Sequence, residues 1–292
     1  MLINLNVSML PKEDLKICFL DFWPEWNQEN FITNILEEKF NVIIDYKNPD
    51  VVFHSAFAIG QYYADRYNCK KILFLGENIR PQKFNTDYSI SFDKSSEKNF
   101  RLPLWQAFIL KKPEYLNRLL TRQTTEKFER FASFTVSNGN NFMRNSLFDQ
   151  LSEYKFVHSY GRYKNNDRSL QENEGKGYWR DIKDDFFMQH PHKFSIVYEN
   201  TRYPLYCTEK LMDSFLTGQM PIYCGDPAVG EDWNLDAFIH GNNLIDQVKI
   251  YDKNPDKFNE KYFEPVFTSS QENKLLDNLA SFETWLIDKI KK

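Results

Sequence analysis

The sequence predicts an α/β protein made of two doubly wound domains, each built on a parallel sheet. Short apolar runs of strand length alternate along the chain with segments whose apolar residues have helical spacing, which is the pattern of βαβ units. The length of 292 residues suits two domains of ordinary size. Hydrophobic residues make up 41% of the chain and aromatic residues 16%, which is enough for two packed cores.

The N-terminal half alternates between predicted strands and helices. Strands are expected at residues 16–21, 42–44, 51–53, 71–75 and 88–92, and the apolar spacing predicts helices over residues 30–40 and 59–67. A longer helical stretch, residues 104–120, is interrupted near Pro113, because proline removes a helical hydrogen bond.

A polar, charged stretch at residues 121–127 marks the expected domain boundary. We therefore expect an N-terminal Rossmann-like domain over residues 1–125, a C-terminal Rossmann-like domain over residues 126–270 and a C-terminal helix over residues 271–292. Within the second domain, strands are predicted at 131–136, 155–157, 194–198, 220–223 and 238–239, with helices at 143–151 and 211–217 and a polar, mobile surface loop at 164–177. The tail has an apolar helix face over residues 274–290, which is more typical of a helix packed across two domains than of a membrane helix.

The most informative segment runs from Phe194 to Gly225. An apolar strand meets the polar pair Glu199 and Asn200, a short loop follows, a helix begins near Glu209, and a second apolar strand closes the unit. This is the size of one parallel crossover unit. Open α/β sheets bind ligands where strands end and helices begin, and the amide groups of a helix start favour an anion such as a diphosphate.

The same segment resembles a known family. A strand ending in (F/Y)EN, then Y-x-T-E-K at a helix start, then P-I-Y-x-G resembles the donor-binding signature of the α1,3/4-fucosyltransferases of glycosyltransferase family 10. Those enzymes move fucose from GDP-fucose to a sugar hydroxyl. The resemblance is best over residues 131–240, with a second matching stretch at 71–104, and it implies the GT-B fold, in which two Rossmann-like domains face each other across a cleft.

Two basic residues are the candidates for holding the donor diphosphate. Arg144 lies at a helix start in SNGNNFMRN, which resembles the family's S-N-x-N-x-x-x-R-N segment, whose arginine holds the donor phosphates. Its forked guanidinium matches phosphate oxygens. Lys210 would add a compact second charge. The alternatives are a capping or paired surface arginine and a solvated lysine pair, and the surrounding motifs favour donor binding in both cases.

The remaining donor-site candidates lie on the same loops. The resemblance implies that Glu209 accepts hydrogen bonds from the ribose hydroxyls and that Tyr206 lies beside the nucleotide, although core packing explains Tyr206 equally well. Asn200 would contact the sugar or the diphosphate. Glu199 is expected to orient the loop backbone, with a sugar contact as the alternative. Arg162 would either reach the diphosphate or cap its own loop.

Glu77 is the candidate catalytic base. It follows a predicted strand in KILFLGEN, which resembles the G-E-N segment of the family's N-terminal domain, whose glutamate is the acceptor-side base. A carboxylate placed after a buried strand can be partly desolvated, which raises its basicity. The alternative is a turn glutamate paired with Arg80 or Lys83.

The chain departs from the family pattern at two positions. His158 stands where relatives commonly have an aspartate, so the contribution of that segment is open. Cys224 stands where relatives often have a tryptophan, and the smaller side chain would change the shape of the pocket wall.

No metal or organic cofactor is expected. The sequence has no D-x-D motif, His190 and His192 lack ligand partners at suitable spacing, and two cations already serve the diphosphate. The four cysteines have no metal-like spacing and are interpreted as reduced thiols. A net charge of −4 argues against a nucleic-acid partner. No signal peptide or apolar run long enough to span a membrane is seen, which predicts a cytoplasmic, bacterial-type enzyme, with a weak peripheral membrane contact through the tail as an additional hypothesis.

Together these features predict an inverting fucosyltransferase that uses GDP-fucose. The expected acceptor is N-acetylglucosamine, at O3, in a glycan such as lipopolysaccharide O-antigen, although the sequence leaves 1,3 and 1,4 linkage open. The first alternative is a transferase of the same fold that uses another nucleotide sugar. The second is a non-catalytic protein that binds glycans or nucleotides, and the presence of Glu77, Arg144 and Lys210 argues against it.

Overall fold

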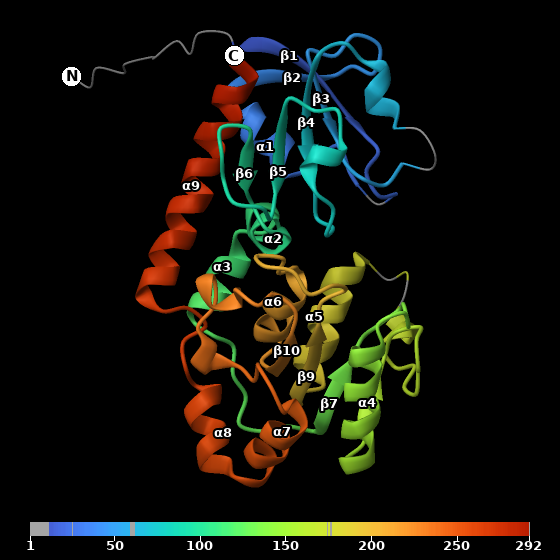
Figure 1. Ribbon diagram of the computed structural model, residues 1–292, viewed down its shortest axis with the longest axis vertical. Helices are drawn as coiled ribbons and strands as arrows, with labels where there is room; N and C mark the ends of the chain where they lie inside the picture. The colour runs from blue at the N-terminus through green and yellow to red at the C-terminus, as the bar shows by residue number, and fades with distance from the viewer. Residues whose placement is uncertain (1–11, 25, 59–61, 174, 176, 292) are drawn as a thin grey trace, which may run out of the picture. The chain divides into compact units, whose positions relative to one another are not determined.

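The computed structural model describes residues 12–24, 26–58, 62–173, 175 and 177–291 (Figure 1). The chain divides into two compact units. The first comprises the described residues of Met1–Arg101 and Ala280–Lys292, and the second comprises those of Leu102–Leu279.

The first unit is built on a six-stranded parallel sheet. Its spatial order is β2-β1-β3-β4-β5-β6, with the strands β1 Glu13–Leu20, β2 Phe40–Ile44, β3 Val51–His54, β4 Lys70–Phe74, β5 Tyr88–Ser91 and β6 Asn99–Arg101. All five strands predicted for this half are present. Because the order reverses between β1 and β3, the topological switch point of this sheet lies between these two strands.

Short helices connect the strands of the first unit. Helix α1, Phe31–Glu37, begins at the N-cap Asn30, whose side chain accepts hydrogen bonds from the backbone N–H groups of Ile32 and Thr33. The described part of the helix predicted at residues 59–67 contains only a 3₁₀ helix, η1 Tyr63–Arg66, and residues 59–61 lie outside the described residues. A second 3₁₀ helix, η2, spans Pro81–Lys83.

The second unit is built on a four-stranded parallel sheet. Its order is β10-β9-β7-β8, with the strands β7 Arg130–Phe134, β8 Val157–Ser159, β9 His192–Tyr198 and β10 Met220–Cys224. The strand predicted at 238–239 is reduced to a single bridge from Ile239 to Ile222. The strand order reverses between β7 and β9, so both units are doubly wound and the predicted fold class is confirmed.

The helices of the second unit include most of those predicted and several that were not. Its α-helices are α2 Leu104–Lys111, α3 Glu114–Leu120, α4 Phe142–Tyr154, α5 Trp179–Gln189, α6 Glu209–Leu216, α7 Leu244–Lys253 and α8 Pro255–Tyr262, with the 3₁₀ helices η3 Gln171–Asn173, η4 Val229–Glu231 and η5 Leu235–Ala237. The sequence did not predict α5, α7 or α8. The break near Pro113, between α2 and α3, is confirmed.

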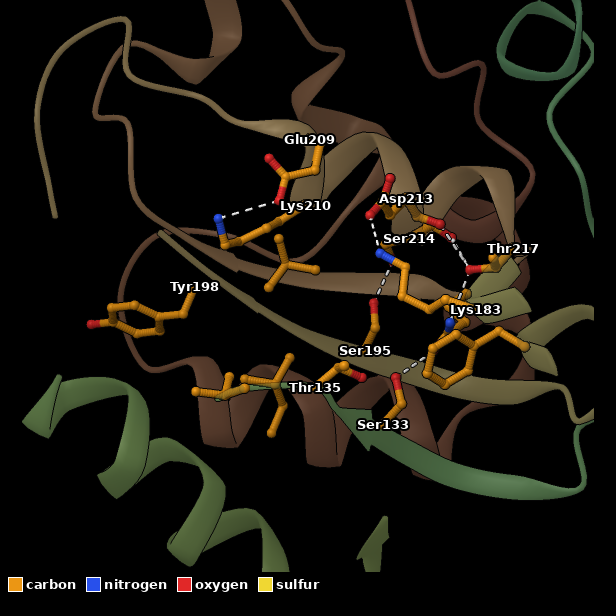
Figure 2. Close-up of a pocket in the computed structure, with 15 residues that line it drawn as sticks. Ser133, Thr135, Lys183, Ser195, Tyr198, Glu209, Lys210, Asp213, Ser214 and Thr217 are labelled. Carbon is orange, nitrogen blue, oxygen red and sulfur yellow. Dashed lines mark hydrogen bonds and ion pairs between the residues drawn. The ribbon is translucent and has the colours of Figure 1, made fainter. Parts of the chain in front are cut away.

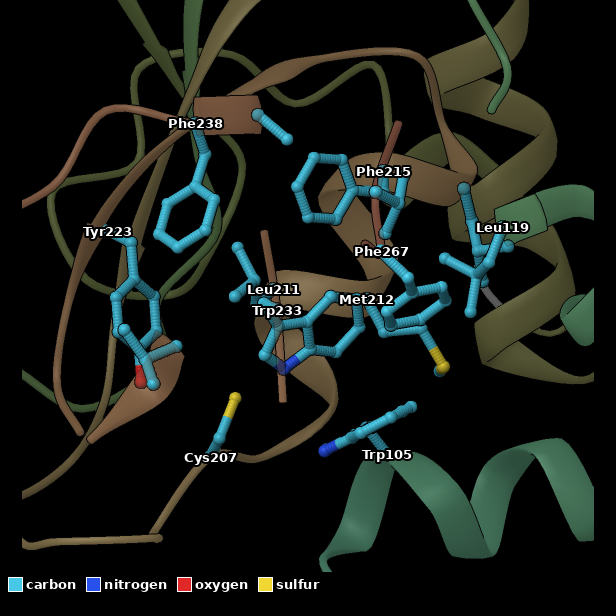
Figure 3. Packing of buried hydrophobic residues seen from close by; sticks show 14 of the residues in the cluster. Trp105, Leu119, Cys207, Leu211, Met212, Phe215, Tyr223, Trp233, Phe238 and Phe267 are labelled. Atoms are coloured by element: carbon cyan, nitrogen blue, oxygen red, sulfur yellow. The ribbon is translucent and has the colours of Figure 1, made fainter. Parts of the chain in front are cut away.

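The boundary between the units differs from the predicted one. Helices α2 and α3 were assigned to the N-terminal domain, but the second unit begins at Leu102. The reason is a large apolar cluster in which Trp105 of α2 and Leu119 of α3 pack with Phe215 of α6 and Trp233 (Figure 3). The ring centroids of Trp105 and Trp233 lie 4.5 Å apart. Burial of these large aromatic surfaces outweighs the polar composition of residues 121–127, which looked like a linker.

Two further segments differ from expectation in detail. The tail forms one helix, α9 Ser269–Lys291; its residues up to Leu279 group with the second unit and those from Ala280 with the first. The described residues of the polar segment 164–177 form a loop that contains the 3₁₀ helix η3, and part of it is packed, because Leu170 is fully buried and Asp167 bonds to His158 at 2.9 Å. Among the helices of the described residues, none has the length and apolar character needed to cross a membrane.

Candidate functional site

The carboxyl ends of β7 and β9 form the centre of the candidate site in the second unit. These strands are neighbours at the switch point of the sheet. The loop after β7 leads into α4 and the loop after β9 leads into α6, so two helix N-termini begin close to the same sheet edge. Open α/β sheets bind ligands in this position, and helix N-termini favour anions.

Glu199 joins the end of β9 to the start of α6. Its carboxylate is fully buried and accepts hydrogen bonds from the backbone N–H and the hydroxyl of Thr208, both at 2.7 Å. Burial raises the pKa of Glu199, whereas Lys210, with Nζ 3.4 Å from Oε2, opposes this rise. A Cβ at Gly225 would lie 2.4 Å from Cγ of Glu199, so glycine is required there for Glu199 to occupy its place. Glu199 is thus bonded to the backbone of the loop in this structure, and a contact between Glu199 and a sugar stays a prediction.

Glu209 and Lys210 open helix α6 and remain partly accessible. The Lys210 side chain is 31% exposed and that of Glu209 is 22% exposed, with 3.6 Å between Nζ and Oε1. Lys210 also donates to the hydroxyl of Thr208 at 2.8 Å. Burial acts to raise the pKa of Glu209, but the cations Lys210, Arg180 and Lys183 outweigh it and hold this pKa at about 2. Glu209 is thus an ionised acceptor, which suits hydroxyl groups of a ligand.

Arg144 lies in the first turn of α4 and is 4% exposed. Its backbone N–H donates at 3.1 Å to the side chain of the N-cap Asn141, and its Nη2 donates to the carbonyl of Asn138. Its Nε is buried and has no hydrogen-bond partner within the described residues. Burial lowers the pKa of this guanidinium. A buried, incompletely paired cation at a helix N-terminus has the chemistry of an anion site.

Asn141 brings the two loops together. Its Nδ2 donates to the carbonyl oxygens of Glu199, at 3.4 Å, and Asn200, at 3.5 Å. The loop carrying Arg144 is therefore held against the end of β9. The sequence did not single out Asn141, although an asparagine directly before a predicted helix is a capping signal that could have identified it.

A cavity of about 140 Å³ opens beside Glu209 and Lys210 (Figure 2). Its walls come from β7, β9, α5 and α6, and they carry Glu209 and Lys210 together with Lys183, Asp213 and Ser195. Lys183 and Arg180 of α5 both pair with Asp213 of α6. The sequence missed these cations because α5 itself was not predicted; the apolar spacing of Ile182, Phe186 and Phe187 was the available signal.

The other predicted donor-site residues differ in how far their side chains are exposed. Asn200 is exposed two residues after the end of β9, and its carbonyl accepts a hydrogen bond from Asn141. Tyr206 is 1% exposed, so its side chain belongs to the core in this structure, and its contact with a nucleotide stays a prediction. Arg162 is exposed in the turn after β8, and neither of its two proposed roles is tested. His158 hydrogen bonds to Asp167, which also pairs with Arg130 at 3.2 Å.

Glu77 lies in the first unit, just beyond the carboxyl end of β4. It is half-buried, and its carbonyl accepts a hydrogen bond from the backbone N–H of Ile79 at 2.7 Å. The guanidinium of Arg80 donates to Asp93 and to the side chain of Asn78. Glu77 thus has the position expected of it relative to the buried strand, and its role as a base stays a prediction.

The described residues contain no cluster of three or more histidine, cysteine or acidic side chains suited to a metal ion. His192 is fully buried and its ring nitrogens contact Tyr160 Oη at 2.9 Å and the carbonyl of His190 at 2.6 Å. All four cysteines are free thiols.

Two family models match the chain. The N-terminal domain of the alpha-(1,3)-fucosyltransferase FucT family matches residues 17–108, and the C-terminal model of glycosyltransferase family 10 (fucosyltransferase) matches residues 125–274.

Among curated proteins, the alpha-(1,3)-fucosyltransferase FucT of Helicobacter pylori is 24% identical over 314 residues, covering 91% of this chain and 63% of that protein. The GDP-fucose protein O-fucosyltransferase 3 of Xenopus laevis is 24% identical over 270 residues, covering 78% of this chain and 57% of that protein. The chain thus spans about three fifths of the length of these relatives.

Solved structures also resemble the chain. Crystal structures of an alpha1,3-fucosyltransferase match with a TM-score of 0.68 for the complex with GDP-fucose and 0.71 for the complex with GDP. Both are 23% identical and cover 96% of this chain and 92% of that protein. The likeness shows a common fold, in agreement with the GT-B class that the sequence resemblance implied.

Proposed function

The chain belongs to glycosyltransferase family 10, and on this premise we propose that it is an inverting fucosyltransferase that takes L-fucose from GDP-fucose. The observation that carries the proposal is the buried guanidinium of Arg144 at the N-terminus of α4, with an unpartnered Nε among the described residues and a loop tied to the end of β9. Lys210 and Glu209 at the start of α6 lie at the same sheet edge.

We propose that each of these residues binds a different part of GDP-fucose. Arg144 and Lys210 would bind the diphosphate and stabilise the charge that develops on it as the glycosidic bond breaks. Ionised Glu209 would accept hydrogen bonds from the ribose hydroxyls, and exposed Asn200 would contact the sugar or the diphosphate. Tyr206, which is buried in the core, would lie beside the nucleotide, and Arg162, in the turn after β8, would either reach the diphosphate or cap its own loop.

Glu77 is the proposed general base of the reaction. Its carboxylate would take the proton of the acceptor hydroxyl as that oxygen attacks the anomeric carbon from the face opposite the diphosphate. A single displacement inverts the anomeric centre, so β-linked GDP-fucose would give an α-fucoside. Because two side-chain cations serve the leaving group, we propose that no divalent ion or other cofactor is required.

The acceptor and the cellular setting are also proposals. We propose O3 of N-acetylglucosamine in a glycan such as lipopolysaccharide O-antigen, and a cytoplasmic protein with at most a weak peripheral membrane contact through its C-terminal helix. The name of the Helicobacter pylori relative supports the 1,3 linkage.

The test is a turnover screen of GDP-fucose and three other nucleotide sugars against a panel of glycan acceptors. The proposal expects nucleotide release and glycan product with GDP-fucose alone, and a 1,3-linked α-fucoside by NMR. Turnover with a different nucleotide sugar would refute the donor assignment. Tight GDP binding without turnover on any acceptor would favour the non-catalytic alternative.

A further inference from the structure

Two aromatic side chains lie together at the switch point of the first sheet. Trp23 follows β1 and Phe57 follows β3, and their ring centroids lie 5.5 Å apart with the planes at 72°. Phe57 is 39% exposed and Trp23 is half-buried, so ring surface from this pair remains accessible. Accessible aromatic surface at the edge where an α/β sheet binds ligands is suited to contact with a ligand.

Hydrogen bonds join the two loops that carry this pair. The N–H of Phe57 donates to the carbonyl of Asp21 at 2.8 Å, which joins the loop after β3 to the loop after β1. Asp21 has a left-handed backbone conformation, with φ of 59°, and its carboxylate accepts the N–H groups of Tyr63 and Ala64, both at 3.1 Å. The strained turn is thus stabilised by several contacts at once.

Further aromatic rings support the pair from behind. Trp23 contacts Trp26 edge to face at 4.9 Å, and Trp26 stacks on Phe22 at 4.2 Å. The buried Phe74 lies 5.8 Å from Trp26. Because the supporting rings are packed, Trp23 and Phe57 are presented with little side-chain entropy left to lose on binding.

The pair shares its sheet edge with Glu77. In the order β2-β1-β3-β4, the strands that precede Trp23, Phe57 and Glu77 are consecutive neighbours. All run parallel, so their carboxyl ends lie at one edge, with neighbouring strands about 4.8 Å apart. An apolar ring surface is therefore placed along the edge that also carries the proposed base.

We propose that Trp23 and Phe57 form a stacking platform for the pyranose ring of the acceptor glycan, an inference that rests on the proposed function. The C–H bonds on one face of a pyranose are weakly positive and pack on the negative face of an aromatic ring. The hydroxyls at the sugar's edge then remain free to meet a carboxylate such as Glu77. The platform holds the acceptor ring, and Glu77 handles the proton of the attacking hydroxyl.

The test compares Trp23→Ala and Phe57→Ala with the wild type. The KM for an N-acetylglucosaminide acceptor should rise roughly three- to tenfold in each variant, while the Kd for GDP measured by calorimetry stays the same. Trp23→Phe and Phe57→Tyr keep a ring at each position and should recover most of the lost acceptor affinity. Phe156→Ala is the matched control, because Phe156 is 59% exposed directly before β8 in the other unit.

Two results would overturn the platform. One is an acceptor KM within twofold of the wild type in Trp23→Ala and Phe57→Ala variants that keep the wild-type circular dichroism spectrum. The other is an equal rise in Phe156→Ala. If the wild type itself shows no turnover, the proposed function fails separately. Saturation-transfer NMR with the methyl N-acetylglucosaminide alone then tests the platform, and a signal unchanged by both alanine variants, or absent from the wild type, overturns it.

Discussion

Replacing Arg144 with alanine would remove a buried cation from the N-terminus of α4. The guanidinium is 4% exposed, and its Nε is free of partners within the described residues, so a bound phosphate would meet it in a poorly hydrated setting. Loss of one such charge-stabilising donor typically costs about 3–4 kcal/mol of transition-state stabilisation, which is on the order of 10²- to 10³-fold in turnover. We expect Arg144→Ala to lie in this range and to weaken GDP binding as well.

The assay must separate loss of binding from loss of folding. Nη2 of Arg144 donates to the carbonyl of Asn138, so the alanine variant also leaves that carbonyl without this donor, at a cost of about 1–3 kcal/mol of folding stability. Thermal unfolding measures this effect, and calorimetry with GDP measures binding in the folded protein. Arg144→Lys keeps the charge but loses the fork, and should fall between the wild type and the alanine variant. Arg168→Ala removes an exposed arginine of the same unit and is the control.

The reasoning is refuted if folded Arg144→Ala binds GDP with wild-type affinity and turns over at the wild-type rate. The diphosphate would then have to lie elsewhere. An equal loss in Arg168→Ala would show that net charge, and not the position of Arg144, sets the affinity.

The remaining predictions concern the catalytic base, the need for a divalent ion, the role of Gly225 and the loss of folding stability at low pH. Glu77→Gln removes basicity while keeping size, so turnover should fall on the order of 10²-fold or more with GDP affinity retained; near-normal turnover would exclude Glu77 as the base. Activity should survive exhaustive EDTA treatment, and complete loss that manganese restores would show that a divalent ion is needed. Gly225→Ala places a methyl group 2.4 Å from Cγ of Glu199 and should lower the free energy of unfolding by about 1–3 kcal/mol. Gly177→Ala is the control, because the nearest atom to its methyl group would be 3.9 Å away, and its free energy of unfolding should not change. Equal melting temperatures for the two variants would contradict this prediction. The pKa of Glu209 is lowered from an ordinary 4.5 to about 2, because neighbouring cations outweigh the effect of its burial. Ionised Glu209 therefore stabilises the fold above about pH 4.5, and this stabilisation is lost as the pH falls toward 2. The stability difference between wild type and Glu209→Gln should shrink across that range, and a pH-independent difference would count against the assignment.

Much of the fold was readable because its signals are local. Most strands of the two sheets are short apolar runs, although β6 Asn99–Arg101 was not predicted and β8 Val157–Ser159 lies later than the strand predicted at 155–157. Side-chain capping by Asn30 and Asn141 is also local, because each side chain accepts from N–H groups two or three residues further along the chain. Helix α5 was not predicted because charged and apolar residues are mixed along it. As a result, Arg180 and Lys183, which lie on this helix, were not recognised as cations of the site. In the described part of the helix predicted at 59–67, the chain forms a 3₁₀ helix, η1, whose first N–H groups donate to the side chain of Asp21, a residue distant in the sequence.

The candidate site was predicted in part for the same reason. The segment from Glu199 to Lys210 carries its information in consecutive residues, so Glu199, Asn200, Glu209 and Lys210 could be named in advance. The sequence could not show that Glu199 is fully buried or that Gly225 makes room for it. These facts require β9 and β10 to lie side by side.

The sequence by itself thus determined the α/β class, most of the strands, the cations and carboxylates at strand and helix ends, and the family. Only the tertiary structure decided that α2 and α3 pack with the second unit, that Asn141 joins the loops after β7 and β9, and that Trp23 and Phe57 meet at one sheet edge. The physical reason is that propensity, periodicity and capping act between residues close in the chain, whereas burial and pairing act between residues that only the packed fold brings together.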